Sequence, residues 1–501
     1  MADQQQMRII FAFVSLSLAA PHLVRSAPPP ATSPSGPITV PLRALSTNPR
    51  YFTSGNGKAV YLTGSQTWNT FQDWGTNDRV QPIDFTAFVN MLLAHNHNFT
   101  LLWATELPTF HGFRTTASSP PDITVAPHPW QRTGPGEASD GKPKFDLNKF
   151  NRGYFDRLHD RVRQLGAAGI YAGCYFFSGE RLNVYRFSRD GYPLSGPNNV
   201  NGVDDGGGTG AVTMTAPNAV TAIQDAYVRK VIDTLNDLPN VLWIVSEEAP
   251  ANSTWWNSHV IAVARSYEAT KPLQHPIGYA VTMSLNDANL LNSDADWIAP
   301  SARISPTTSC GSGHPTCKVN INDSDHSYWE MWKDPPQTNR NYFWFNFTNG
   351  NQTLFMDPYV IYYPRQNRNL SPSPINGISP TPDARWTNVR DTMGFIRAYA
   401  DRMNLATMTP QGNLASTGHA LANTSPGGAE FLVYAPSGGA LDVNLSGINA
   451  PFAVEWMNPE TGVKTPGEPA HGGGTVTFAP PFPFGLDAVL YLRETGAAPP
   501  R

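Results

Sequence analysis

Residues 154–177 read YFDRLHDRVRQLGAAGIYAGCYFF, and this stretch decides the fold class. Its first half carries apolar residues at helical spacing: Phe155, Leu158, Val162 and Leu165. This spacing of three, four and three residues is typical of one buried face of an α-helix. The helical pattern ends at Gly166, and the apolar run 170–177 follows it. A helix followed by such a run is typical of a parallel sheet with crossover helices.

The same alternation recurs along the chain. Short β-rich runs occupy 59–63, 99–103, 170–177, 241–245, 276–281, 296–299, 319–322 and 353–356. A second helical pattern contains Trp256, Val260, Val263 and Tyr267, and a last one contains Met393, Ile396, Ala400 and Met403. Eight strands with helical returns predict a (β/α)8 barrel, with a doubly wound open sheet as the alternative topology.

The pattern changes after residue 405. Short alternating runs are separated by turn residues and lie at 431–434, 441–445, 452–456, 475–478 and 488–492. They predict a small antiparallel β-sandwich. The expected organisation is a signal peptide (1–26), a Pro/Ser-rich leader (27–47), a barrel (48–405) and a C-terminal sandwich (406–495).

The N-terminus indicates export from the cell. Arg8 precedes the apolar stretch 9–20, which has the length of a signal peptide and is too short to cross a membrane. Cleavage near Ser26 would fit, and no second candidate span follows. We therefore predict a secreted protein without a membrane span. Cys310 and Cys317 flank a Gly/Pro-containing loop, and the sequence leaves their pairing open, whereas Cys174 is expected to be a buried hydrophobe.

The overall composition argues against nucleic acid as a partner. Only 15% of the residues are charged, and 35 basic residues face 39 acidic ones, for a formal net charge of -4. Such a chain has no basic field to neutralise phosphates.

Polar residues follow the predicted strands where each strand ends, and a (β/α)8 barrel builds its active site there. The carboxylates at these points are Glu106, Glu180, Glu247, Glu248, Asp323, Asp325 and Asp357. Beside them stand Trp68, Asn69, Trp103 and His326. Aromatic faces stack on sugar rings, and two carboxyl groups supply the acid and the base or nucleophile of glycoside cleavage. The pattern therefore favours a carbohydrate site.

These positions also have structural interpretations. Glu106 and Glu180 could begin helices or form ion pairs at the rim, and Trp68 and Trp103 could cap the barrel core. Because Glu247 and Glu248 are adjacent at a strand end, their side chains should point in different directions, so at most one is the acid.

A metal site is a further alternative. Asp323, Asp325 and His326 offer three possible ligands, but no fourth ligand follows at helical spacing. We therefore predict no metal and no other cofactor. The motifs of zinc proteases, serine hydrolases and P-loop nucleotide-binding proteins do not occur in the sequence.

Several strings resemble the cellulase-like and apiosidase-like glycoside hydrolases. The strings are NPRYF (48–52), VYLTGSQTWN (60–69), KFDL (144–147), YFDRL (154–158), NVLW (240–243) and SEEA (246–249). The resemblance spans residues 48–493, implies a (β/α)8 barrel, and includes a C-terminal module similar to a domain labelled collagen-binding.

The resemblance also implies roles for individual residues. Glu248 falls on the acid/base glutamate at the end of the fourth strand. Glu247 takes the place of the family's asparagine, and as a like charge it would raise the pKa of Glu248. The string containing Asp323 and Asp325 resembles an Asp-Thr-Asp-His motif of the relatives. Which aspartate faces the site, and whether cleavage retains or inverts the anomeric configuration, stays open.

The sequence thus predicts a secreted glycoside hydrolase. Glu248 would protonate the leaving oxygen, and Asp325 or Asp323 would attack the anomeric carbon or activate water. The expected substrate-binding residues are Trp68, Asn69, Trp103, Glu106, Glu247, His326 and Asp357. The alternatives are a non-catalytic carbohydrate- or matrix-binding protein, in which Glu247 marks lost chemistry, and a metal-dependent hydrolase.

Overall fold

The structure is a computed structural model of the chain. It describes residues 37–76, 79–110, 123–183, 190–283, 287–301, 317–328, 331, 334–359 and 384–496. The predicted signal peptide, most of the leader and Cys310 lie outside the described residues. Cys317 is disulfide-bonded and Cys174 is a free, buried thiol.

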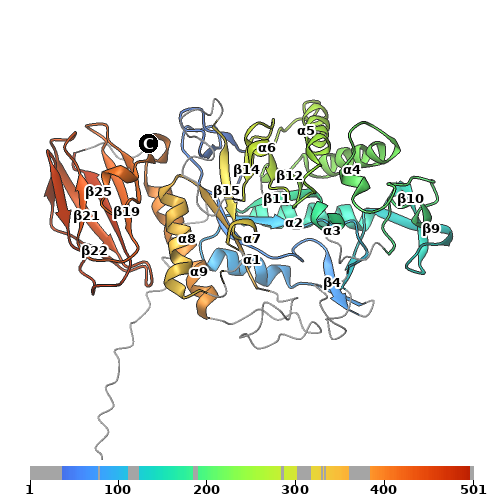
Figure 1. Cartoon of the computed structure of the whole chain (residues 1–501), viewed down its shortest axis with the longest axis horizontal. Helices are drawn as coiled ribbons and strands as arrows, with labels where there is room; N and C mark the ends of the chain where they lie inside the picture. The colour runs from blue at the N-terminus through green and yellow to red at the C-terminus, as the bar shows by residue number, and fades with distance from the viewer. Residues whose placement is uncertain are drawn as a thin grey trace, which may run out of the picture.

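Eight parallel strands form the central sheet (Figure 1). They are β3 (Thr63–Gln66), β6 (Phe99–Leu102), β11 (Tyr171–Phe177), β12 (Val241–Ser246), β13 (Ile277–Ala280), β14 (Trp297–Ala299), β15 (Val319–Asp323) and β16 (Gln352–Met356). The order in the sheet is β3-β16-β15-β14-β13-β12-β11-β6, so strands that follow each other in the chain are neighbours, and β16 pairs with β3. This order confirms the barrel, and the open doubly wound sheet is wrong.

The barrel nearly closes between β3 and β6. The Asn98 N–H donates to the Thr63 carbonyl at 3.0 Å, and the Thr100 hydroxyl donates to the Ser65 carbonyl at 2.8 Å. Gly64 makes this approach possible, because a Cβ at that position would lie 1.9 Å from the Phe99 carbonyl oxygen.

The first strand differs from its prediction. The expected run was 59–63, whereas β3 covers Thr63–Gln66, with its four residues TGSQ all buried. Two of its polar side chains find partners on other parts of the barrel: Thr63 Oγ1 lies 3.2 Å from Thr353 Oγ1, and Gln66 Oε1 accepts the indole N–H of Trp103 at 2.6 Å. A hydrophobicity pattern misses a strand of this kind.

Helices alternate with the strands. The longer ones are α1 (Phe85–Ala94), α2 (Arg152–Ala167), α4 (Ala219–Leu235), α5 (Thr254–Glu268), α8 (Pro336–Thr348) and α9 (Ala384–Arg402). Short turns form α3 (Gly179–Asn183), α6 (Ala288–Leu291) and α7 (Ser324–Tyr328). Asn151 caps α2 by accepting the Gly153 N–H at 3.1 Å, and the predicted apolar face of α2 is buried. The predicted helical patterns of α5 and α9 are likewise confirmed.

Small β elements that the sequence did not predict surround the barrel. A four-stranded sheet contains β4 (Asp73–Thr76), β5 (Arg79–Gln81), β7 (Thr109–Phe110) and β8 (Ile123–Ala126). Two further pairs are β1 (Arg43–Ala44) with β2 (Phe52–Thr53), and β9 (Trp130–Glu137) with β10 (Pro143–Phe150). Because β4, β7, β8, β9 and β10 follow barrel strands, they extend the edge at which those strands end.

The C-terminal part consists of antiparallel sheets, as predicted. One contains β17 (Thr409–Pro410), β18 (Ala420–Asn423), β19 (Glu430–Ala435), β25 (Ala488–Glu494), β21 (Pro451–Met457), β22 (Lys464–Pro466) and β23 (Ala470–His471). The other pairs β20 (Leu441–Asn444) with β24 (Thr475–Phe478). Leu441, Val443 and Phe478 of the smaller sheet share one apolar core with Phe431 and Leu490 of the larger sheet.

The barrel and the C-terminal sheets share a core across the predicted boundary at residue 405. Trp344 of α8 stacks on Tyr434 of β19, with ring centroids 5.8 Å apart. Beside them, Arg340 donates to both oxygens of Asp487, at 3.0 and 2.7 Å, and both side chains are almost completely buried. In Figure 1, α8 and α9 stand directly beside the block formed by β19, β21, β22 and β25. Among the described helices, none is long and apolar enough to cross a membrane.

Candidate active site

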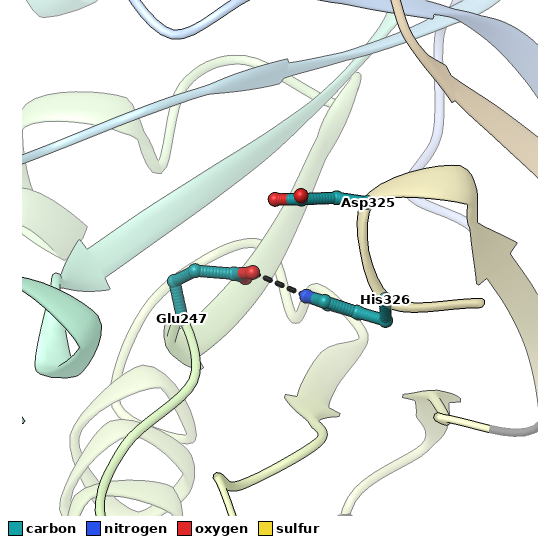
Figure 2. A group of neighbouring side chains, drawn as sticks. All are labelled: Glu247, Asp325 and His326. Carbon is teal, nitrogen blue, oxygen red and sulfur yellow. Dashed lines mark hydrogen bonds and ion pairs between the residues drawn. The ribbon is translucent and has the colours of Figure 1, made fainter. Parts of the chain in front are cut away.

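Two strand ends bring acidic residues and a histidine together at the C-terminal edge of the barrel. Glu247 and Glu248 directly follow β12, Asp323 ends β15, and Asp325 and His326 lie in the first turns of α7. One polar atom each of Glu247, Asp325 and His326 lies within 4.8 Å of the other two. Figure 2 shows these three side chains converging from the end of β12 and the start of α7.

Glu247 is paired with a charged partner. Its Oε1 accepts a hydrogen bond from Nε2 of His326, and its Oε2 accepts one from the hydroxyl of Tyr175 in β11. The His326 side chain is completely buried. Burial, the largest influence, lowers the pKa of His326, but the Glu247 carboxylate and its neighbours bring that pKa well above 6.5. The surroundings of His326 therefore favour its imidazolium form.

Glu248 lies in an unusual backbone conformation beside this pair. Its φ of 34° falls in the left-handed region that non-glycine residues rarely adopt. Burial raises the pKa of Glu248 to about 7, His326 lowers it, and Glu247 and Glu180 raise it. Near neutral pH the Glu248 side chain is therefore protonated in a substantial fraction of the protein molecules, as a general acid needs to be.

Asp323 and Asp325 differ in their surroundings. Asp323 is buried; its Oδ1 accepts the Asp325 N–H at 3.0 Å, and Nε2 of Gln66 lies 3.5 Å from its Oδ2. Burial raises the pKa of Asp323 to about 6. The Asp325 side chain is partly exposed and makes no hydrogen bond within the described residues. Its pKa is raised well above 3.8 by burial and then by Glu248, the strongest charged influence on it.

Trp103 contacts two side chains that in turn touch this cluster, Gln66 and Tyr175. Its indole N–H donates to Oε1 of Gln66 at 2.6 Å, and its ring stacks on Tyr175 with centroids 4.7 Å apart. Gln66 and Tyr175 were not among the predicted site residues. Tyr175 lies within an apolar run and Gln66 lies in the polar strand TGSQ, and only their partners, distant in the sequence, reveal their place beside the site.

Trp68 lies in a second aromatic group on the same edge. Its ring is parallel to that of Trp74, with an interplanar angle of 3° and centroids 6.3 Å apart. The Arg181 guanidinium lies 5.2 Å from the centre of the Trp74 ring, and its Nε is 3.1 Å from Glu180 Oε2. Burial raises the pKa of Glu180, while Arg181 lowers it. Trp68 remains partly exposed, as a sugar-stacking ring would need to be.

The remaining predicted residues are buried at the strand ends. Asp357 accepts hydrogen bonds from Nε and Nη2 of Arg390 at 2.7 and 2.5 Å, so its carboxylate is held by α9. Asn69 is completely buried, and neither its amide oxygen nor its amide nitrogen has a partner in the described residues. Glu106 is 5% exposed, and burial raises its pKa to about 7.

Comparison with solved structures places the barrel among known folds. The chain superimposes on a protein described as a glycoside hydrolase with a TM-score of 0.57 and 12% identity, over 92% of this chain and 98% of that one. A family 5 glycoside hydrolase from Bacteroides vulgatus gives a TM-score of 0.57 and 13% identity, over 91% of this chain and 94% of that one. The chain shares the overall fold of these two proteins.

The C-terminal part of the chain matches a family model. Residues 412–493 match the family described as "Putative collagen-binding domain of a collagenase". This match confirms the resemblance expected for that module. No curated protein sequence matches the chain.

The side chains of this cluster meet some of the requirements of a metal site. Glu247, Asp325 and His326 are close enough together to suggest one. However, His326 Nε2 and Glu247 Oε1 contact each other directly in a hydrogen bond, whereas the ligand atoms of a metal surround the ion. A metal bound by both atoms would have to replace this hydrogen bond.

Glu106 provides a test of how burial of a carboxyl group at the edge of the barrel affects the stability of the protein. Because its pKa rises from 4.5 to about 7 on folding, the folded state loses stability as the pH increases through that interval. We expect Glu106→Gln to remove this loss and to unfold at higher urea concentration than the parent at pH 8, by up to about 3 kcal/mol. At pH 4 the gain should disappear. An equal gain at both pH values would contradict this account.

Proposed function

We propose that the protein is a secreted glycoside hydrolase that cleaves O-glycosidic bonds of an oligo- or polysaccharide, with Glu248 as the general acid and Asp325 as the base or nucleophile. The observation that carries the proposal is that Asp325 lies within 4.8 Å of Glu247, the residue that directly precedes Glu248, at the mouth of the barrel. In addition, Glu248 raises the pKa of Asp325. Glycoside hydrolysis in most families needs a carboxyl pair of this kind.

The two carboxyl groups would have different roles in bond cleavage. Glu248 transfers its proton to the glycosidic oxygen as the bond to the anomeric carbon breaks. The Asp325 carboxylate attacks that carbon or removes a proton from the attacking water, depending on the distance between the two groups. Asp325 is favoured over Asp323 because the Asp323 oxygens already accept the Asp325 N–H and contact Gln66.

Two features support secretion. The apolar stretch 9–20 has the length of a signal peptide, and Cys317 is disulfide-bonded. Disulfides persist mainly in oxidising compartments outside the cytosol.

Three further residues would surround the sugar. They stand at the ends of β3 and β11 and are Trp68, Asn69 and Glu180.

The test is a glycan panel assayed with the parent and with Glu248→Gln, which keeps the shape of the side chain and removes its proton. We expect the parent to release reducing sugar from at least one glycan, and the variant to be at least about 100-fold slower. Glu468→Gln, at an exposed position of the C-terminal sheets, is the matched control and should behave as the parent.

Two results would contradict the proposal. Equal turnover by the parent and Glu248→Gln would remove Glu248 from the chemistry. Glycan binding by both proteins without product from any glycan would favour the alternative of a non-catalytic carbohydrate-binding protein.

A further inference from the structure

Glu247 is fixed on both of its oxygens by side chains from two other parts of the barrel. Tyr175 comes from β11, and His326 comes from α7, just after β15. Tyr175 is 4% exposed, Glu247 is 2% exposed and the His326 side chain is completely buried. Figure 2 shows the contact between Glu247 and His326. The three side chains thus form a buried chain of hydrogen bonds across the barrel mouth.

The His326 imidazolium lies among carboxyl groups. The titratable and charged groups around it are Tyr175, Glu180 with its partner Arg181, Glu247, Glu248, Asp323 and Asp325. For Glu248, Asp323 and Asp325 alike, His326 lowers the pKa more than Glu247 raises it. The net effect of the pair on these three carboxyl groups is therefore that of the positive charge.

We propose that Glu247 is a positioning residue: together with Tyr175 it fixes the His326 imidazolium inside the carboxyl cluster, so that Glu248 and Asp325 are not both protonated. This role deepens the proposed function and rests on it, because glycoside cleavage needs one protonated and one ionised carboxyl group. Glu247 acts through His326 and does not itself touch the reacting atoms.

The physical reason lies in the cost of burial. Desolvation raises the pKa values of both Glu248 and Asp325 and so favours the protonated form of both carboxyl groups, whereas a cation beside them favours the ionised form. A buried imidazole without a counter-charge would itself be neutral. The Glu247 carboxylate supplies that counter-charge, and a neutral amide at position 247 could not.

The first test removes the charges of the pair and keeps its polarity. In the double variant Glu247→Gln/His326→Gln, two amides can still hydrogen-bond and the net charge is unchanged. Since the positive end of the pair is lost, the acid limb of the kcat/KM profile should move about one unit to higher pH. An acid limb that stays in place, or that moves to lower pH, would overturn the proposal.

The matched control is the exposed pair of His159 and Asp237, whose Nε2 and Oδ2 atoms are 3.0 Å apart on the outside of the barrel. His159→Gln/Asp237→Asn removes the same kind of ion pair far from the carboxyl cluster. Its pH profile should match that of the parent. A shift equal to that of the first double variant would show that the effect is one of general charge, and would overturn the specific role of Glu247.

A second measurement does not depend on turnover. The imidazole resonances of His326, assigned by their loss in His326→Gln, are followed by NMR against pH. In the parent the titration midpoint of His326 should lie well above 6.5, and in Glu247→Gln it should fall by more than about one unit. An unchanged midpoint would overturn the proposal even if the double variant were inactive at every pH. Failure of the parent to cleave any glycan would instead overturn the proposed function alone.

Discussion

Asp325→Asn is expected to lower kcat for glycoside hydrolysis by about 10⁴-fold, because the amide can neither attack the anomeric carbon nor accept a proton from water. KM should change little, since the side chain would act mainly in the transition state. The measurement is steady-state kinetics on the best glycan of the panel. The anomer released by the parent, read by NMR within the first turnovers, then shows whether Asp325 is the nucleophile of a retaining enzyme or the base of an inverting one.

Asp323→Asn is the matched control for this variant. Asp323 accepts the N–H of Asp325 and contacts Gln66, so an amide at this position should mainly loosen the first turn of α7. We expect a lower melting temperature and a smaller loss of kcat than for Asp325→Asn. The reverse order of activity, with Asp325→Asn within tenfold of the parent, would transfer the catalytic role to Asp323.

Arg340→Met is expected to destabilise the protein by about 3–5 kcal/mol, because it leaves the buried Asp487 carboxylate without its bidentate partner. Asp487 would keep only the Tyr434 hydroxyl, which donates to it at 3.0 Å. Urea unfolding followed by tryptophan fluorescence measures the change. Replacing both partners, as Arg340→Met/Asp487→Asn, should recover part of the lost stability, since no charge is then left buried.

The shared core also predicts how the two parts unfold. Trp344 and Tyr399 of the barrel helices pack with Tyr434 and Tyr491 of the C-terminal sheets, so both parts should unfold in one transition. Arg152→Met is the control, because its ion pair with Asp156 is exposed and should add nothing measurable. Two separate transitions in the parent, or equal stability of Arg340→Met and Arg152→Met, would contradict a shared core.

Much of the fold could be predicted from the sequence because burial leaves a local pattern. In β11 and β12 every residue is buried, and both strands appear as continuous apolar runs. In contrast, β3 reads TGSQ, and β9 contains Gly134, Pro135 and Gly136, which are typical of a turn. Tertiary hydrogen bonds define these strands, and hydrophobicity does not record such bonds.

The site could be predicted only in part for a related reason. The position of a barrel active site at the strand ends gave a set of carboxylates, among which the family resemblance favoured Glu248, while the choice between Asp323 and Asp325 stayed open. The partner of Glu247 stands 79 residues further along the chain, and that of Asp357 is Arg390, 33 residues away. No spacing rule connects such pairs, so the sequence could present Glu247 as a departure from a pattern but could not show what it binds.

The backbone at Glu248 has a consequence for any attempt to make this protein more robust. A side chain at a φ of 34° costs free energy that glycine or asparagine would avoid. A selection for heat resistance alone would therefore reward replacement of Glu248, and would discard the proposed proton donor as it did so. Screens for more stable variants therefore need an activity assay at every round, because at this position a substitution that raises stability would remove the proposed catalytic group.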